Sequence, residues 1–115
     1  AVAANAQQPL LEGTSWSMIG ETGKGGRFIS FADEGRLSGF AGCNRLMGRY
    51  TAQDGELTVT NIGTTRMACG GDAMIKETEF LDLLGKVRGA RMGHTLLQLF
   101  DETGTEIGAL EKRLP

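Results

Sequence analysis

The stretch Ser38–Arg45 has the sequence SGFAGCNR and contains Cys43, one of only two cysteines in the chain. The other, Cys69, ends the stretch TTRMAC at Thr64–Cys69. Both cysteines lie among glycines and threonines rather than in a CxxC pair, which favours one structural disulfide in an exported domain. Two free buried thiols are the second interpretation, and reactive or metal-bound cysteines are the third.

Strand-type runs extend outward from this stretch in both directions, separated by turn signals such as Asp33-Glu34-Gly35 and Asp54-Gly55. The connections are too short for parallel crossovers, so we expect antiparallel pairing. The predicted strands are Thr14–Ile19, Arg27–Phe31, Arg36–Phe40, Asn44–Thr51, Glu56–Thr60, Ala90–Met92, Thr95–Phe100 and Thr105–Leu110. In the first of them, Trp16 is the only tryptophan, and we expect it to anchor the core.

The apolar period becomes helical once, from about Asp72 to Val87. Asp72 is the predicted N-cap and Gly89 the predicted stop. The expected apolar side of this helix consists of Met74, Thr78, Leu81 and Leu84, widened by Phe80 and Val87. The expected solvent side consists of Lys76, Glu77, Asp82 and Lys86. The sequence therefore predicts an α+β fold, a strongly curved, barrel-like antiparallel β-sheet of about eight strands with one α-helix packed over it.

The composition limits the function classes. A chain of 115 residues is long enough for one domain with its own core. Its 18 glycines are more than twice the usual share of about 7%, which indicates turns, bulges and close packing in a sheet-rich fold. A net charge of −2 without a basic run argues against nucleic acid as a partner. No apolar stretch approaches about 18 residues, so we expect no transmembrane segment.

The first residues resemble the end of a secretory signal. Ala1–Gln8 is rich in small residues, and Ala4-Asn5-Ala6 fits an A-x-A cleavage site. We expect a flexible leader over residues 1–12, a single domain over residues 13–112, and export to the periplasm, the outer membrane or the medium. A disordered leader or the remnant of a tag is the alternative for these first residues.

The most suggestive polar residues follow Cys43. Asn44 suits a turn or a bulge, and Arg45 suits either an internal ion pair or an anionic ligand. Arg66, within the second cysteine motif, is the third candidate for a binding or structural role. We favour structural roles, and ligand binding is the alternative.

No set of catalytic or metal-binding residues is evident. Two sulfurs and the single histidine, His94, fall short of the usual four metal ligands, and His94 is expected in a solvated turn. No G-x-S-x-G motif occurs, and the helix carboxylates Glu77, Glu79 and Asp82 are expected mostly on the solvated side. We therefore expect no metal, no cofactor and no enzymatic activity.

These motifs resemble the META domain family, which includes the bacterial heat-shock protein HslJ. The resemblance covers about residues 13–110. It rests on Gly13–Trp16, Phe31, Gly35–Gly39, Ala41–Arg45, Gly48–Tyr50, Thr65–Cys69, the helix with Glu77, Glu79, Phe80-Leu81 and Leu84, and on Leu96–Leu99 and Gly104. It implies an exported or envelope-associated bacterial domain linked to heat shock and drug tolerance, without established catalytic residues. It also implies a disulfide between Cys43 and Cys69. Gly70-Gly71, directly after Cys69, departs from the family pattern.

The function expected on these grounds is that of a non-enzymatic exported or envelope domain of this type, which acts by binding or structural support during stress. Its partner would be an unknown envelope protein or a small ligand, and we expect a monomer. The alternative is a module that binds a small ligand or a partner protein, inhibitor-like or adaptor-like, through the Asn44 and Arg45 region. A weak enzyme with an unrecognised site is the third hypothesis.

Overall fold

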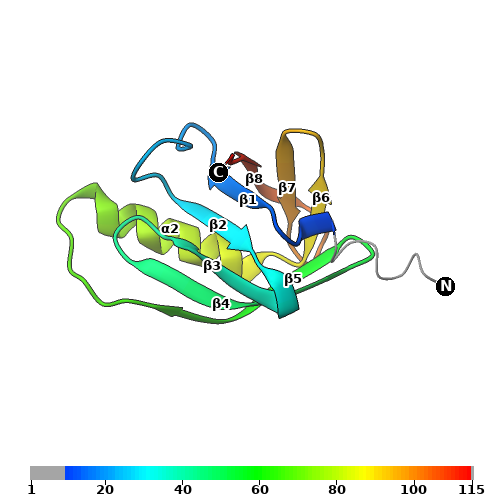
Figure 1. Cartoon of the computed structure of the whole chain (residues 1–115), viewed down its shortest axis with the longest axis horizontal. Helices are drawn as coiled ribbons and strands as arrows, with labels where there is room; N and C mark the ends of the chain where they lie inside the picture. The colour runs from blue at the N-terminus through cyan, green and yellow to red at the C-terminus, as the bar shows by residue number, and fades with distance from the viewer. Residues whose placement is uncertain (1–9, 115) are drawn as a thin grey trace.

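The computed structural model describes residues 10–114, so residues 1–9 of the leader predicted over residues 1–12 lie outside the described residues. Within this range, antiparallel strands follow one another in sequence order and close into a barrel (Figure 1). The strands are β1 (Ser15–Met18), β2 (Phe28–Phe31), β3 (Arg36–Phe40), β4 (Arg45–Gln53), β5 (Glu56–Thr64), β6 (Gly89–Met92), β7 (Leu96–Phe100) and β8 (Glu106–Lys112). The predicted curved antiparallel sheet is confirmed, and pairing of β8 with β1 closes it.

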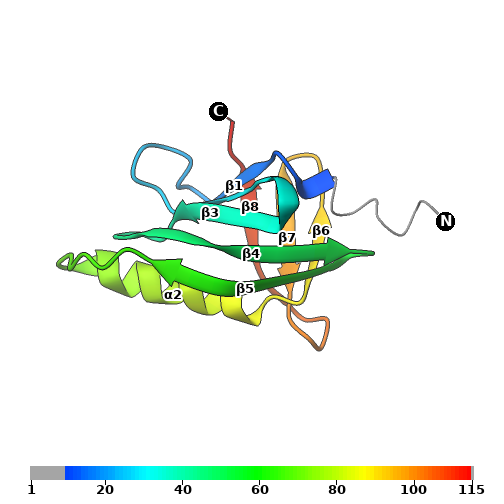
Figure 2. The ribbon, with the colours of Figure 1, turned by 60° about the horizontal axis from the view of Figure 1, so that its bottom comes forward.

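The extent of strand pairing differs around the barrel. β4 and β5 form a long hairpin of nine residues a side, whereas β5 and β6 pair only at Glu56 and Gly89. The helix α2 (Asp72–Lys86) connects β5 to β6 and runs alongside β5 (Figure 2). The helix also packs closely against β8. A Cβ added to Gly108 of β8 would lie only 3.3 Å from a methyl group of Leu83 in α2. The helix therefore covers the side of the barrel on which strand pairing is sparse.

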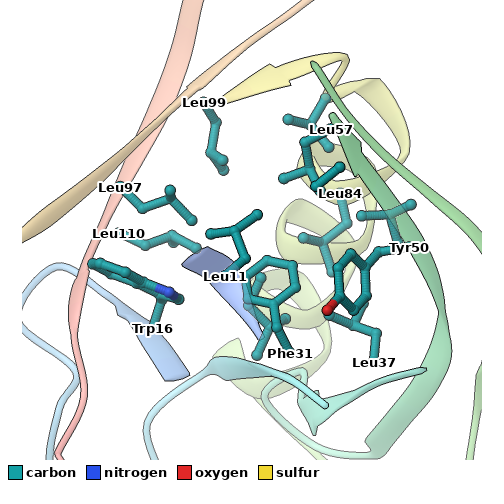
Figure 3. Close-up of a cluster of buried hydrophobic side chains, with 14 of the residues drawn as sticks. Leu11, Trp16, Phe31, Leu37, Tyr50, Leu57, Leu84, Leu97, Leu99 and Leu110 are labelled. Carbon is teal, nitrogen blue, oxygen red and sulfur yellow. The ribbon is translucent and has the colours of Figure 1, made fainter. Parts of the chain in front are cut away.

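One apolar cluster fills the barrel (Figure 3). Trp16 is fully buried, as predicted, and its indole Nε1 donates to the Thr14 hydroxyl at 2.8 Å. Phe31 and Tyr50 pack edge to face with ring centroids 4.8 Å apart. Leu11 belongs to the same cluster and is only 1% exposed. The ordered domain therefore begins before residue 13, because this leucine completes the core.

The helix differs from its predicted pattern in several respects. Gly71 is the N-cap and Asp72 lies in the first turn, while Gly89 is already the first residue of β6. Phe80, Leu84 and Val87 are buried as expected, but Met74 and Thr78 are exposed. The largest difference is Glu77, which was assigned to the solvent side and is buried at 5% exposure. The helix is rotated relative to the expected stripe because Glu77 makes hydrogen bonds inside the protein.

The buried Arg27, directly before β2, attaches the first half of α2 to this part of the barrel. Arg27 is 6% exposed and pairs with Glu21, and its Nη1 also donates to the Lys76 carbonyl of α2 at 3.0 Å. The hydrogen bond from the Arg27 side chain is the main reason why the pKa of Glu21 falls from 4.5 to about 2, against the opposing effect of burial. The folded protein therefore binds the Glu21 proton more weakly than the unfolded chain.

This difference predicts an acid-dependent loss of stability. A carboxyl with a lowered folded-state pKa stabilises the fold above its unfolded pKa, and the contribution disappears as pH falls through the folded pKa. We expect the difference in unfolding free energy between wild type and Glu21→Gln to be largest at pH 7 and to shrink between pH 4.5 and about 2. Urea unfolding of both proteins across this range measures it. A difference that does not change with pH would contradict the assignment.

Candidate functional site

A disulfide joins Cys43 and Cys69, whose Cα atoms are 5.9 Å apart. It connects the segment between β3 and β4 to the segment that follows β5, just before α2 begins. This is the pairing that the sequence motifs favoured, and neither sulfur is a free nucleophile while the bond is intact. Two segments that are 26 residues apart in sequence are thereby held together.

The buried carboxylate of Glu77 is the centre of this region. Its Oε1 accepts hydrogen bonds from the backbone N–H groups of Cys43, at 3.1 Å, and Asn44, at 2.7 Å. Its Oε2 accepts from the Asn44 side-chain amide at 2.9 Å. One side chain of α2 therefore satisfies three N–H groups of the β3–β4 connection.

Gly42 makes this contact possible. Its φ is 131°, and a Cβ at this position would lie 3.1 Å from the Ala73 carbonyl oxygen and 3.2 Å from the Glu77 nitrogen. Because contacts this short are rarely tolerated and this φ is unfavourable for other residues, only glycine fits here without a shift of the backbone. The glycine therefore lets the β3–β4 connection lie directly against the backbone of α2.

Asn44 uses all of its side-chain hydrogen-bonding capacity. Its Nδ2 donates to Glu77 and to the Met67 carbonyl at 3.2 Å, and its Oδ1 accepts from the Met67 N–H at 2.6 Å and the Thr65 hydroxyl at 3.0 Å. An amide with two donors and one carbonyl oxygen has no further capacity. Asn44 therefore connects β4, α2 and the segment before Cys69.

Two opposing effects set the pKa of Glu77. Burial is the larger single influence and raises the pKa, because an ionised carboxylate loses its hydration. The hydrogen bonds from the side chain and backbone of Asn44 and from the backbone of Cys43 together outweigh burial and lower the pKa below its ordinary value of 4.5. Glu77 is thus an ionised, buried acceptor at neutral pH.

Sequence reasoning assigned Glu77 to the solvent side and missed its burial, because a glutamate on a helix is usually solvated. One signal was present: Glu77 lies three residues before Phe80 and seven before Leu84, which places all three on the same side of the helix. A carboxylate at such a position requires buried donors. The donors come from Cys43 and Asn44, which are more than thirty residues away in the sequence.

The two candidate arginines have a different environment from Asn44. Arg45 begins β4 and is exposed, and Arg66 is also exposed. Among the ion pairs formed within residues 10–114, none involves either guanidinium. The predicted internal pairing of Arg45 is therefore wrong, because alternation along β4 directs its side chain to the outer face of the barrel.

The remaining polar candidates do not come together. His94 is exposed between β6 and β7. The Glu79 carboxylate Oε1 lies 3.7 Å from Nη1 of Arg27, and the Asp82 carboxylate Oδ2 lies 2.9 Å from Nζ of Lys86. Across the part of the chain that the structure describes, no three histidine, cysteine or carboxylate side chains are grouped as metal ligands. In the same part, no helix has the length and apolarity needed to cross a bilayer.

The fold and this site define a class: a closed eight-stranded antiparallel barrel with one helix, in which a disulfide and a buried glutamate hold the β3–β4 connection. The META domain model matches residues 10–113, so the chain belongs to the META domain family. A comparison with curated proteins finds no match.

Three solved structures share this fold. An NMR structure of a protein from Burkholderia xenovorans is 25% identical with a TM-score of 0.74, and the match covers 94% of this chain and 87% of that one. A second protein solved by NMR is 21% identical with a TM-score of 0.69, and 95% of each chain is covered. A DUF4847 family protein from Bacteroides vulgatus ATCC 8482 is 11% identical with a TM-score of 0.68, over 90% of this chain and 95% of that one.

Proposed function

We propose that this chain is a non-enzymatic domain that is exported to the bacterial envelope or beyond, where it acts by binding or structural support during stress. The observation that carries the proposal is the disulfide between Cys43 and Cys69. Such bonds persist in oxidising compartments and are rare in the cytosol. Its position next to the Glu77 contacts gives it a structural role, because it strengthens a connection that those hydrogen bonds already make.

The internal bonding of the cysteines, Asn44 and Glu77 supports a role without catalysis. Both cysteines are bonded to each other, and the buried groups of Asn44 and Glu77 are occupied by internal hydrogen bonds. A catalytic nucleophile or base would need an accessible, activated group within reach of a substrate. These four side chains hold the fold together instead.

Binding of a small ligand or a partner protein is the second candidate, and the surface around Arg45 favours it. Met47 is 58% exposed on the same face of β4, and Met67 is 57% exposed beside Arg66. Asn44 holds both the N–H and the carbonyl of Met67. Exposed methionines and arginines on a rigid support are typical of binding surfaces. The partner would be an envelope protein or a small ligand.

A complementation experiment tests the proposed function. In the source organism, deletion of this chain should lower survival after heat stress at least tenfold, and exported wild-type protein should restore it. The same chain without an export signal should not restore survival, because the disulfide would not form. As a control for catalysis, exported His94→Ala should restore survival as well as wild type. Full rescue by the cytosolic form, or loss of rescue with stably folded His94→Ala, would contradict the proposal.

A further inference from the structure

The outer face of β3, β4 and β5 carries an open hollow of about 640 Å³. Met47 lies in the middle of it, paired across the sheet with Ser38 on one side and Gly63 on the other. Arg36 and Arg49 lie at one end. The volume is within the range of about 300–1,000 Å³ that is usual for small-molecule sites.

The backbone around the hollow is shaped by a β-bulge. The register between β4 and β5 shifts between Met47 and Arg49, and Asn61 lies opposite the shift with a φ of 55°. Gly48 is closely packed, because a Cβ there would be 3.0 Å from the Thr60 carbonyl oxygen and the neighbouring backbone would have to shift. Bulges and positive φ values in residues other than glycine often occur next to functional sites.

Gly63 keeps the hollow open for a different reason. A Cβ added to it would meet no atom within 4 Å, and its backbone does not need glycine. A larger side chain would therefore be tolerated by the fold and would extend over the hollow. The absence of a side chain here leaves the thioether of Met47 accessible from the β5 side.

At one end of the hollow, one of two neighbouring guanidinium groups has no carboxylate partner within residues 10–114. Arg36 and Arg49 are directly opposite each other on neighbouring strands, an arrangement that is unfavourable for like charges. Arg36 is neutralised by Asp33 and lies 4.0 Å from Glu34. Within residues 10–114, the Arg49 side chain donates only to the Glu34 backbone carbonyl, at 2.8 Å. The guanidinium of Arg49 therefore has donors left for an anion.

We propose that this hollow binds a small amphipathic monocarboxylate, with its apolar chain over Met47 and its carboxylate on Arg49. The assignment rests on the proposed binding function and specifies its ligand class. A guanidinium presents two parallel N–H donors that match one carboxylate. Arg36 is already paired with Asp33, so Arg49 is the guanidinium with donors left for a single carboxylate, which suits a monoanion.

Titration with sodium octanoate tests the site. We expect octanoate to shift the amide resonances of Met47, Gly48 and Gly63 saturably, whereas octan-1-ol and acetate, which each lack one half of the ligand, bind at least tenfold more weakly. Arg49→Gln should weaken octanoate binding at least tenfold because the carboxylate loses its charged partner. Gly63→Phe should weaken it at least tenfold by filling the hollow.

Matched controls keep the test specific. Gly23→Phe places the same ring at another glycine with open space, and Arg91→Gln removes an exposed arginine from β6; both should bind octanoate as wild type does. Thermal unfolding of every variant shows whether it is folded.

Absence of saturable octanoate binding, equal binding of octan-1-ol, or undiminished binding by folded Gly63→Phe would overturn the assignment. The assignment would also be overturned if the protein bound an apolar peptide amide and its resonances did not respond to octanoate. None of these outcomes changes the complementation result, so the two proposals fail separately.

Discussion

Replacing Cys43 and Cys69 together with alanine is expected to lower the free energy of unfolding by about 3.5 kcal/mol. The disulfide closes a loop with a sequence separation of 26 residues, and the loss of chain entropy in the unfolded state accounts for an effect of this size. For a small domain whose total stability is about 5–15 kcal/mol, this is a large fraction. Urea unfolding at neutral pH measures the change.

Reduction of the wild-type protein provides the control. In the presence of a reductant that breaks the bond, the wild type should unfold at nearly the same urea concentration as the double variant. Each single variant should behave like the double variant, because either substitution removes the bond. Equal midpoints for oxidised wild type and the double variant would show that the disulfide does not stabilise the fold.

Replacing Glu77 with leucine is expected to lower the free energy of unfolding by at least about 3 kcal/mol. The variant leaves the backbone N–H groups of Cys43 and Asn44 and the Asn44 amide without their acceptor. Each buried donor that loses its partner costs about 1–3 kcal/mol. Glu79→Leu is the matched control on the same helix, because the Glu79 side chain is 68% exposed, and it should change stability by less than about 0.5 kcal/mol.

The pH dependence distinguishes the charge of Glu77 from its shape. Its pKa is lowered in the fold, so the carboxylate stabilises the protein above the ordinary pKa of 4.5, and this contribution is lost as pH falls below that value. The difference between wild type and Glu77→Gln should therefore be larger at pH 7 than at acidic pH. Working in the Glu21→Gln background removes a second carboxyl whose pKa is lowered in the fold, in its case to about 2. Equal stability of the Glu77→Leu and Glu79→Leu variants would show that the buried hydrogen bonds are dispensable.

The strands and the helix could largely be predicted from local pattern. Alternation in Glu56–Thr60 and the turn at Asp54-Gly55 predicted the β4–β5 hairpin, and the change of period near Asp72 predicted α2. These signals are local because strand alternation and helical periodicity depend on neighbouring residues. The strand β5 is nevertheless longer than predicted and ends at Thr64, since the bulge around Asn61 interrupts its alternation.

The candidate site was predicted only in part. The cysteine pair followed from the motifs, whereas the hydrogen-bond network of Asn44, the outward direction of Arg45 and the burial of Glu77 did not. The hollow over Met47 was also beyond sequence reasoning, because it depends on the pairing of Met47 with Gly63 and on the bulge between them.

The sequence by itself thus determined the class of fold, the number and order of its strands and the two cysteines available for a bond. Only the tertiary structure decided that β8 meets β1 to close the barrel, that Glu77 turns inward to the Cys43 and Asn44 backbone, and that Arg49 and Met47 share one hollow. The physical reason is the separation in sequence between the residues that make contact. Strand and helix patterns express contacts between near neighbours, whereas a buried carboxylate and a surface hollow depend on partners that folding alone brings from distant parts of the chain.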